Sequence, residues 1–325
     1  MSLPLPAPSA STEEILALEH ASLCAWPALA TAAAGPFLLR HANGFTRRAN
    51  SAVLAFPLPS LSVVSGADCN AAPGLGSDIT PGTPPGTAKT EPPQNGLQAR
   101  VQQKGPHEDA ATPILPDALF RDICAWYAAR NLPPLFRIPQ AADRGLDAAL
   151  AARGCPVQEV SLVMSRPLHA FAHPQPCPPG TAFGEMPQRQ TAPDWQVASL
   201  SREEWLNAAR HLLTETPLAQ ATLERMLALH TGHCDFHAIH HGSAIVSCAL
   251  GVFMEGMYGL YSIRTAESCR RQGCATALVS AMMQHARQLG AHTAWLQVLA
   301  ANAPAIRLYE RFGFVPRYRY WYRSA

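Results

Sequence analysis

The chain has 325 residues, of which 48% are hydrophobic and 15% charged, with a formal net charge of +2. This length favours two domains with packed cores. The nearly neutral charge argues against nucleic acid or a membrane surface as partner. Nine cysteines at irregular spacing, with no C-x-x-C, indicate reduced thiols rather than a disulfide framework or a zinc ribbon.

The first twenty residues lack a basic start and a long apolar run, so we expect no signal peptide. No stretch approaches the roughly 18 uninterrupted apolar residues of a membrane span. Together with the reduced cysteines, these features predict a cytoplasmic protein.

The N-terminal part is predicted to begin with a helix over 12–34, ended or kinked at Pro27. Two strands are expected within 35–56, around the turn signal Asn43-Gly44. Residues 66–113 are rich in Pro, Gly and Thr and poor in aliphatic residues, which predicts a disordered insertion. The elements expected next are a helix at 116–129, a strand at 135–139, a helix at 145–153 and a strand at 157–165.

A second Pro-rich stretch, 166–182, is predicted to be a linker between domains at 1–165 and 183–325. The second domain is expected to contain helices at 201–213 and 217–230, strands at 235–241, 244–254 and 257–265, a helix from 274 to about 289, a strand at 292–299, a helix at 303–312 and a strand at 313–323. This succession predicts an α/β fold, with a mixed sheet covered by helices on both faces.

The turn before the helix at 274 has the sequence RRQGCA, residues 270–275. Gly273 can adopt backbone angles closed to other residues and admits a ligand to the main chain. The first N–H groups of the helix lack helical acceptors, and Arg270 or Arg271 would add charge-assisted bonds. The turn is either a plain strand-to-helix connection with a solvated arginine pair or a grip for a phosphate.

This turn matches the pattern [Q/R]-x-x-G-x-[G/A] of the GCN5-related N-acetyltransferases (GNAT), and the segments AWLQVL and ANAPAIRLYERFGF follow at that family's spacing. Residues 183–325 therefore resemble a GNAT domain. The resemblance implies a GNAT fold and acetyl-CoA as cosubstrate, its diphosphate at the turn and its pantetheine arm along a strand backbone. The implied cofactor-binding residues are Ile263, Arg264, Thr265, Arg270, Arg271, Gln272, Gly273, Cys274, Ala275, Thr276, Asn302 and Tyr309.

The resemblance also implies direct transfer of the acetyl group to an amine, with Tyr309 as the catalytic residue whose hydroxyl stabilises or protonates the departing thiolate. Alternatively, Tyr309 is a core aromatic residue. Asn302 is expected to cap its helix, whether or not it also bonds the cofactor. Strand amides would polarise the thioester carbonyl, and no cysteine is needed as a nucleophile. The general base that deprotonates the amine is left unassigned, and the candidates are Glu255, Glu267, Tyr258 and a water chain.

The first domain loosely echoes the second and lacks the phosphate-binding turn, so we expect a degenerate GNAT-like domain, as in tandem members of the family. Arg47, Arg48 and Asn50 are either polar residues exposed on a strand or contacts to substrate or to the second domain.

Five histidines, an aspartate and a cysteine lie within residues 230–242, yet we expect no native metal there. His237 and His240 would point to opposite faces of a strand, and no second cluster completes the coordination. A strand at the sheet edge is the expectation. The terminal YRYWYR likewise predicts a last strand rather than a nucleic-acid contact.

The sequence thus predicts an acetyl-CoA-dependent N-acetyltransferase, active in its C-terminal half, that acts as a monomer or homodimer on a small-molecule or peptide amine. The alternative is a non-catalytic module that binds acyl-CoA as a sensor or docks a partner.

Overall fold

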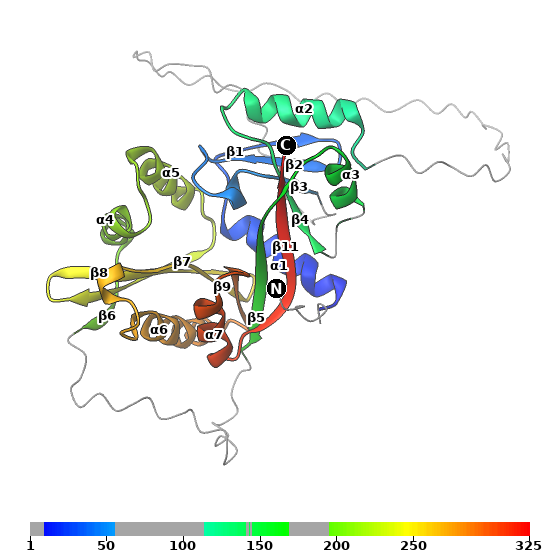
Figure 1. Ribbon diagram of the computed structural model, residues 1–325. Coiled ribbons are helices and arrows are strands. Elements are labelled where there is room, and N and C mark those ends of the chain that lie inside the picture. The colour runs from blue at the N-terminus through cyan, green and yellow to red at the C-terminus, as the bar shows by residue number, and fades with distance from the viewer. Residues whose placement is uncertain (1–9, 56–113, 141–142, 144, 169–194) are drawn as a thin grey trace, which may run out of the picture. The chain divides into compact units, whose positions relative to one another are not determined.

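The computed structural model describes residues 10–55, 114–140, 143, 145–168 and 195–325. Their strands form a single 11-stranded mixed sheet in the order β1-β2-β3-β4-β11-β5-β10-β9-β8-β7-β6 (Figure 1). The predicted α/β fold with a mixed sheet is confirmed. The predicted insertion at 66–113 and most of the predicted linker lie outside the described residues.

The elements of the N-terminal half are α1 (Thr12–Ala25), β1 (Ala30–Ala34), β2 (Phe37–His41), the 3-10 turn η1 (Arg47–Ala49), β3 (Ala52–Leu54), α2 (Asp117–Ala128), β4 (Leu135–Pro139), α3 (Leu146–Ala152) and β5 (Val157–Pro167). The predicted helix over 12–34 is wrong beyond Ala25. Pro27 cannot continue the helix, and the alanine-rich segment after it pairs as β1 with β2, so tertiary pairing overrides helix propensity. The turn at Asn43-Gly44 is confirmed by positive φ at both residues.

The C-terminal half comprises β6 (Gln196–Ser199), α4 (Arg202–Leu212), α5 (Pro217–Ala228), β7 (His233–His241), β8 (Ala244–Met254), β9 (Met257–Thr265), the 3-10 turn η3 (Glu267–Cys269), α6 (Cys274–Gln288), β10 (Thr293–Leu299), α7 (Ala303–Arg311) and β11 (Val315–Ser324). These elements agree with the predicted ones except for β6, which was not expected. Because β6 pairs with β7 from Gln196 opposite His240 to Ser199 opposite His237, β7 is an interior strand and the expected sheet edge is wrong.

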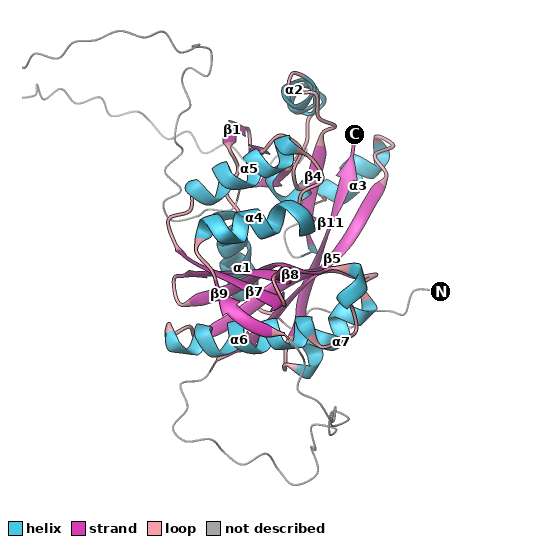
Figure 2. Ribbon diagram, turned by 90° about the vertical axis from the view of Figure 1, so that its left-hand side faces the viewer, coloured by secondary structure: helices cyan, strands magenta, loops and turns pink. Residues whose placement is uncertain are grey.

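Helices cover both faces of the sheet around β7, β8 and β9 (Figure 2). On one face, α1, α4 and α5 bury a core that includes Trp205, Leu223 and Trp295. On the other face, α6 packs Leu278 and Met282 against the sheet. Helices α4 and α5 begin at residues whose side chains cap them. Ser201 and Glu204 form a capping box at α4, and Thr216 caps α5 before Pro217.

Strand β5 connects the two halves. It pairs on one side with β10, from Ser161 opposite Leu299 to Pro167 opposite Thr293, and on the other side with β11. Strand β11 in turn pairs with β4. The sheet is therefore continuous across the predicted boundary at 166–182, and the division into two domains remains a prediction.

A buried ion pair fastens α1 to this central region. Glu19 and Arg137 are each about 1% exposed, and both guanidinium nitrogens of Arg137 contact the Glu19 carboxylate. The Tyr318 hydroxyl donates a further hydrogen bond to Glu19 Oε1 (2.5 Å), and the guanidinium lies 3.9 Å from the ring centroid of Tyr320. Helix α1 and strands β4 and β11 thus meet at one fully buried charge pair.

Candidate active site

The turn before α6 has the conformation that a phosphate grip requires. Gly273 is the N-cap of α6 with φ 96°, in the left-handed region, and Arg271 is also left-handed with φ 60°. No side chain caps the helix and no acidic residue lies in its first turn. The first N–H groups are thus available to an anion, which the helix dipole also favours.

The two arginines of this turn differ in their partners. Arg270 forms an exposed ion pair with Glu267 (3.0 Å), and its Nε donates to the carbonyl of Thr265 (3.5 Å). Arg271 is exposed and has no ion-pair partner among the described residues. Gln272 donates to the Ser268 carbonyl, and Cys274 is buried with its thiol pKa raised mainly by desolvation. Of the two arginines, Arg271 is therefore the one whose charge is available to bind a phosphate. Cys274 is a packing residue.

Next to the turn, β9 and β10 part. These parallel strands pair only from Met257 opposite Thr293 to Leu260 opposite Leu296. Beyond that point β9 stays with β8 and β10 stays with β5. A bulge drives the separation: Ser262 has φ 52°, and the β8–β9 register shifts beside it. Ile263, Arg264 and Thr265 therefore lie along the gap, on the part of β9 that β10 does not pair with.

Both helices that follow these strands, α6 and α7, begin at the same edge of the sheet, where ligands of α/β folds usually bind. Asn302 caps α7 by accepting from the Ala305 amide (3.2 Å), which confirms its structural role. Tyr309 is 9% exposed and packs edge-on against Phe314. Burial raises the pKa of its hydroxyl to about 12, so the phenol keeps its proton at neutral pH. It is a core aromatic residue and also a competent proton donor.

A cavity of about 350 Å³ opens beside the gap between β9 and β10. Gln297, the first β10 residue beyond the last β9 pair, belongs to its wall. Arg48 also lines it, with its guanidinium 5.4 Å from the ring centroid of Tyr261 in β9 and Nη1 3.3 Å from Gln297 Oε1. The complete lining is Arg47, Arg48, Glu159, Ser161, Gln297, Val298, Leu299, Tyr320 and Tyr322.

The lining of this cavity is cationic. Arg47 is neutralised by an ion pair with Glu159, whereas Arg48 has no carboxylate partner among the described residues. The Tyr322 hydroxyl is buried without a hydrogen-bond partner. With Arg48 in its wall, the cavity is large enough for a small ligand or the end of a longer one.

Of the three polar residues noted around residue 47, two lie at this cavity and one does not. Arg47 and Arg48 belong to η1 rather than to a strand. Asn50 is 5% exposed, and its Oδ1 accepts from the amides of Ala42 and Gly44 (2.7 and 3.0 Å). Asn50 thus holds the 42–50 loop together and has no part in substrate contact. Sequence reasoning missed Tyr320, Tyr322 and Gln297, because only the fold brings them to η1.

The structure disfavours each residue considered as the base. Glu255 lies in the β8–β9 hairpin, ten residues before Thr265, and β9 from Met257 to Thr265 alone spans roughly 26 Å. Glu267 is exposed and paired with Arg270. Tyr258 is fully buried, and desolvation, with the Asp235 charge second, raises its pKa far above the usual range. None of these three side chains is therefore assigned as the base.

Fold and site together place an uncapped helix start beside a split pair of parallel strands. Residues 195–314 match the family model described as "Acetyltransferase (GNAT) family", so this part of the chain is a GNAT domain. Residues 12–65 match a second model, described as "Probable histone acetyltransferase Rv0428c C-terminal". The family resemblance read from the turn at 270–275 is confirmed.

A curated relative is the "[Ribosomal protein bS18]-alanine N-acetyltransferase" of Escherichia coli K12, 40% identical over 55 residues. The match spans 17% of this chain and 37% of that enzyme, little more than a third of its length. Among the described residues, no helix is both long and apolar enough to cross a membrane.

Solved structures resemble the chain more widely at low identity. A functionally unknown conserved protein from Staphylococcus epidermidis matches with a TM-score of 0.50 and 8% identity over 97% of both chains, which shows a shared fold. A GCN5-related N-acetyltransferase from Sphaerobacter thermophilus matches with a TM-score of 0.48 and 17% identity, over 64% of this chain and 66% of that one.

Proposed function

We propose that this chain is an acetyl-CoA-dependent N-acetyltransferase whose catalytic residues lie within 183–325. The observation that carries the proposal is the left-handed Gly273 at an uncapped helix start, directly beside the gap between β9 and β10. The diphosphate binds the N–H groups of the first α6 turn, and Arg271 adds a charge-assisted bond. The pantetheine arm lies along the backbone of Ile263, Arg264 and Thr265.

The reaction needs no covalent enzyme intermediate. The amine nitrogen attacks the thioester carbonyl, the new C–N bond forms and the C–S bond breaks. Backbone amides in the gap stabilise the developing oxyanion. Tyr309, which its raised pKa keeps protonated at neutral pH, gives its proton to the leaving thiolate. The acceptor's ammonium group loses one proton to water before the attack, and the second proton, which the nitrogen loses as the amide forms, returns through water to Tyr309.

The acceptor binds in the cavity lined by Arg48 and Tyr322. Because the unpaired charge there is positive, the cavity suits an amine that also bears an anionic group, such as an amino acid, and repels a polyamine. The curated relative supports an amine acceptor, but its match covers too little of that enzyme to carry its substrate over.

Gly273 and Gly290 offer a matched test of cofactor binding. Both have positive φ, at opposite ends of α6, and neither has a neighbour that an added Cβ would strike. Alanine at either position costs about 1 kcal/mol of backbone strain. We expect Gly273→Ala to weaken acetyl-CoA binding, measured by isothermal titration, at least tenfold, while Gly290→Ala leaves it unchanged. Equal affinity of the two variants for acetyl-CoA would refute the proposed diphosphate site at Gly273.

Coenzyme A release on incubation with a panel of amines distinguishes the enzyme from an acyl-CoA sensor. Turnover with any amine supports the proposal. Tight acetyl-CoA binding without turnover across amino acids, peptides and polyamines would favour the sensor.

A further inference from the structure

The histidine-rich strand β7 places three polar side chains on one face of the sheet. His233, Asp235 and His237 alternate along the strand, and side chains two residues apart share a face. That face packs against α6, which contributes His285 near its C-terminal end. The complementary ligand that the sequence did not reveal is therefore His285, which α6 contributes fifty residues after Asp235.

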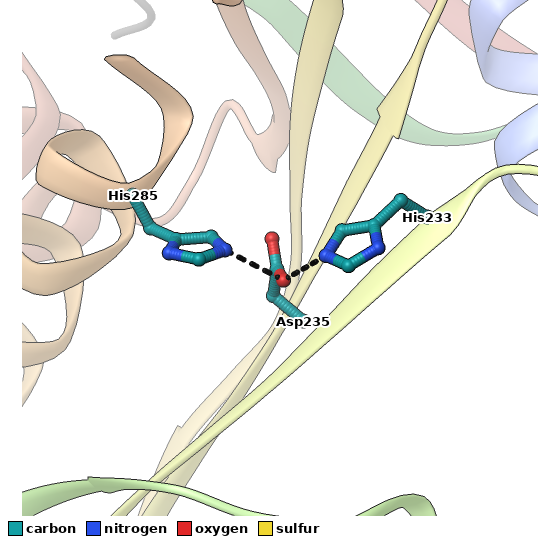
Figure 3. A group of neighbouring side chains, drawn as sticks. All are labelled: His233, Asp235 and His285. Atoms are coloured by element: carbon teal, nitrogen blue, oxygen red, sulfur yellow. Dashed lines mark hydrogen bonds and ion pairs between the residues drawn. The ribbon is translucent and has the colours of Figure 1, made fainter. Parts of the chain in front are cut away.

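His233, Asp235 and His285 converge on one point (Figure 3). His233 Nε2 lies 2.7 Å and His285 Nε2 lies 3.0 Å from the same oxygen, Asp235 Oδ1. One potential ligand atom from each residue falls within 4.8 Å of the others. The Asp235 side chain is 8% exposed, whereas the His233 side chain is 53% exposed, so the cluster is anchored in the interior and open to solvent on one side.

Polar atoms beside this cluster are left without partners. His237 is 4% exposed and its Nε2 has no hydrogen bond, although its ring centroid lies 6.0 Å from that of His285. The second carboxylate oxygen, Asp235 Oδ2, is also buried without a hydrogen-bond partner among the described residues. The same holds for the Tyr258 hydroxyl, so these two atoms form no hydrogen bond of ordinary geometry with each other. Hydrogen bonds within the cluster therefore do not account for all of its buried donors and acceptors.

We propose that His233, Asp235 and His285 bind a Zn²⁺ ion. Two imidazoles and one carboxylate are donors typical of zinc, whereas Ca²⁺ and Mg²⁺ take oxygen ligands throughout. The site lies eleven residues along α6 from Cys274, roughly 16 Å from the phosphate-binding turn. The ion fastens the C-terminal end of α6 to β7, a function separate from acetyl transfer.

The test is zinc titration of the full, tag-free chain after treatment with a chelator, followed by isothermal calorimetry and by cobalt substitution. We expect a single equivalent of Zn²⁺ and a visible Co²⁺ absorption typical of low coordination number. Asp235→Asn and His285→Ala should each weaken Zn²⁺ binding more than about tenfold, since even outer partners of metal sites matter on that scale. Zn²⁺ should raise the Tm of the parent chain and not that of Asp235→Asn.

His240→Ala is the matched control, because His240 lies on the same strand outside the cluster, and its Zn²⁺ affinity should equal that of the parent. His233→Ala guards against a folding defect: its exposed side chain can be removed without opening the core, yet Zn²⁺ affinity should fall. Zn²⁺ affinity that stays unchanged in Asp235→Asn, His285→Ala and His233→Ala, or no Zn²⁺ binding by the parent, would overturn the proposal.

Discussion

Arg47 and Arg48, two adjacent residues of η1, line the same cavity but differ in their charge partners. Arg47 is paired with Glu159, and Arg48 lies over the rings of Trp26 and Tyr261 with only Gln297 as a hydrogen-bond acceptor in the wall. A substrate anion therefore gains little from Arg47, whose charge is already compensated. Arg48 keeps its charge available, since an aromatic ring does not neutralise a guanidinium.

Replacing Arg48 by alanine should raise KM for acceptors that carry a carboxylate by about tenfold or more, the scale of one charge-assisted bond. The KM for acetyl-CoA should change little. Arg47→Ala is the control with a smaller effect on acceptor KM. Steady-state kinetics with an amino acid and a polyamine checks this, and an equal response of both acceptors to Arg48→Ala would contradict the assigned role.

The phenol of Tyr309 is predicted to act only as a proton donor. Since burial raises its pKa to about 12, the protonated, active form persists as pH rises and is lost only on approach to that value. No fall in kcat between pH 7 and 10 should therefore arise from Tyr309. Tyr309→Phe should lower kcat by about a hundredfold across this range. A pH–rate profile of both forms measures it, and unchanged kcat in the variant would leave Tyr309 as a packing residue alone.

At the scale of elements, the buried pair of Glu19 and Arg137 makes α1 indispensable to the sheet. Glu19→Ala leaves the guanidinium buried without a counter-charge, a situation that costs about 3–5 kcal/mol. The exposed Glu13 of the same helix is the control, and Glu13→Ala should cost less than about 1 kcal/mol. Urea unfolding gives both values. Similar losses from the two substitutions would show that the pair contributes no more than a surface charge.

Sequence alone could predict the elements whose signals are local. The turn at 270–275 depends on glycine, arginine and small residues in one short run, and α6 begins directly after it as predicted. Helix α7 likewise begins at Ala303, the residue predicted from Asn302 and the proline that follows. The segment 30–34 was misread because alanine favours a helix in isolation and only its pairing with β2 makes it a strand. The gap beside β9 depends on the bulge at Ser262, a residue whose type gives no warning of positive φ.

At the scale of the whole molecule, the sheet brings together residues that no local pattern could connect. The cavity takes its walls from η1, β5, β10 and β11, so Arg48 and Gln297 meet across 249 positions of sequence. The cluster of β7 and α6 unites His233 with His285 in the same way. The cavity and the cluster both need distant segments to be brought together by the sheet, which explains why the turn at 270–275 could be predicted from sequence and the cavity could not.

The continuity of the sheet makes a prediction about the boundary at 166–182. A fragment of residues 183–325 lacks β5, so β10 and β11 lose the strand that lies between them and expose unpaired edges. We expect this fragment to aggregate or to lose its near-ultraviolet circular dichroism, although it carries the phosphate-binding turn and Tyr309. A fragment of 157–325, which retains β5, should fold better but less stably than the full chain, since it lacks Glu19 and Arg137. Size-exclusion chromatography and urea unfolding rank the three proteins. If 183–325 alone matched the full chain in stability, β5 would be dispensable and the C-terminal half would be an independent domain.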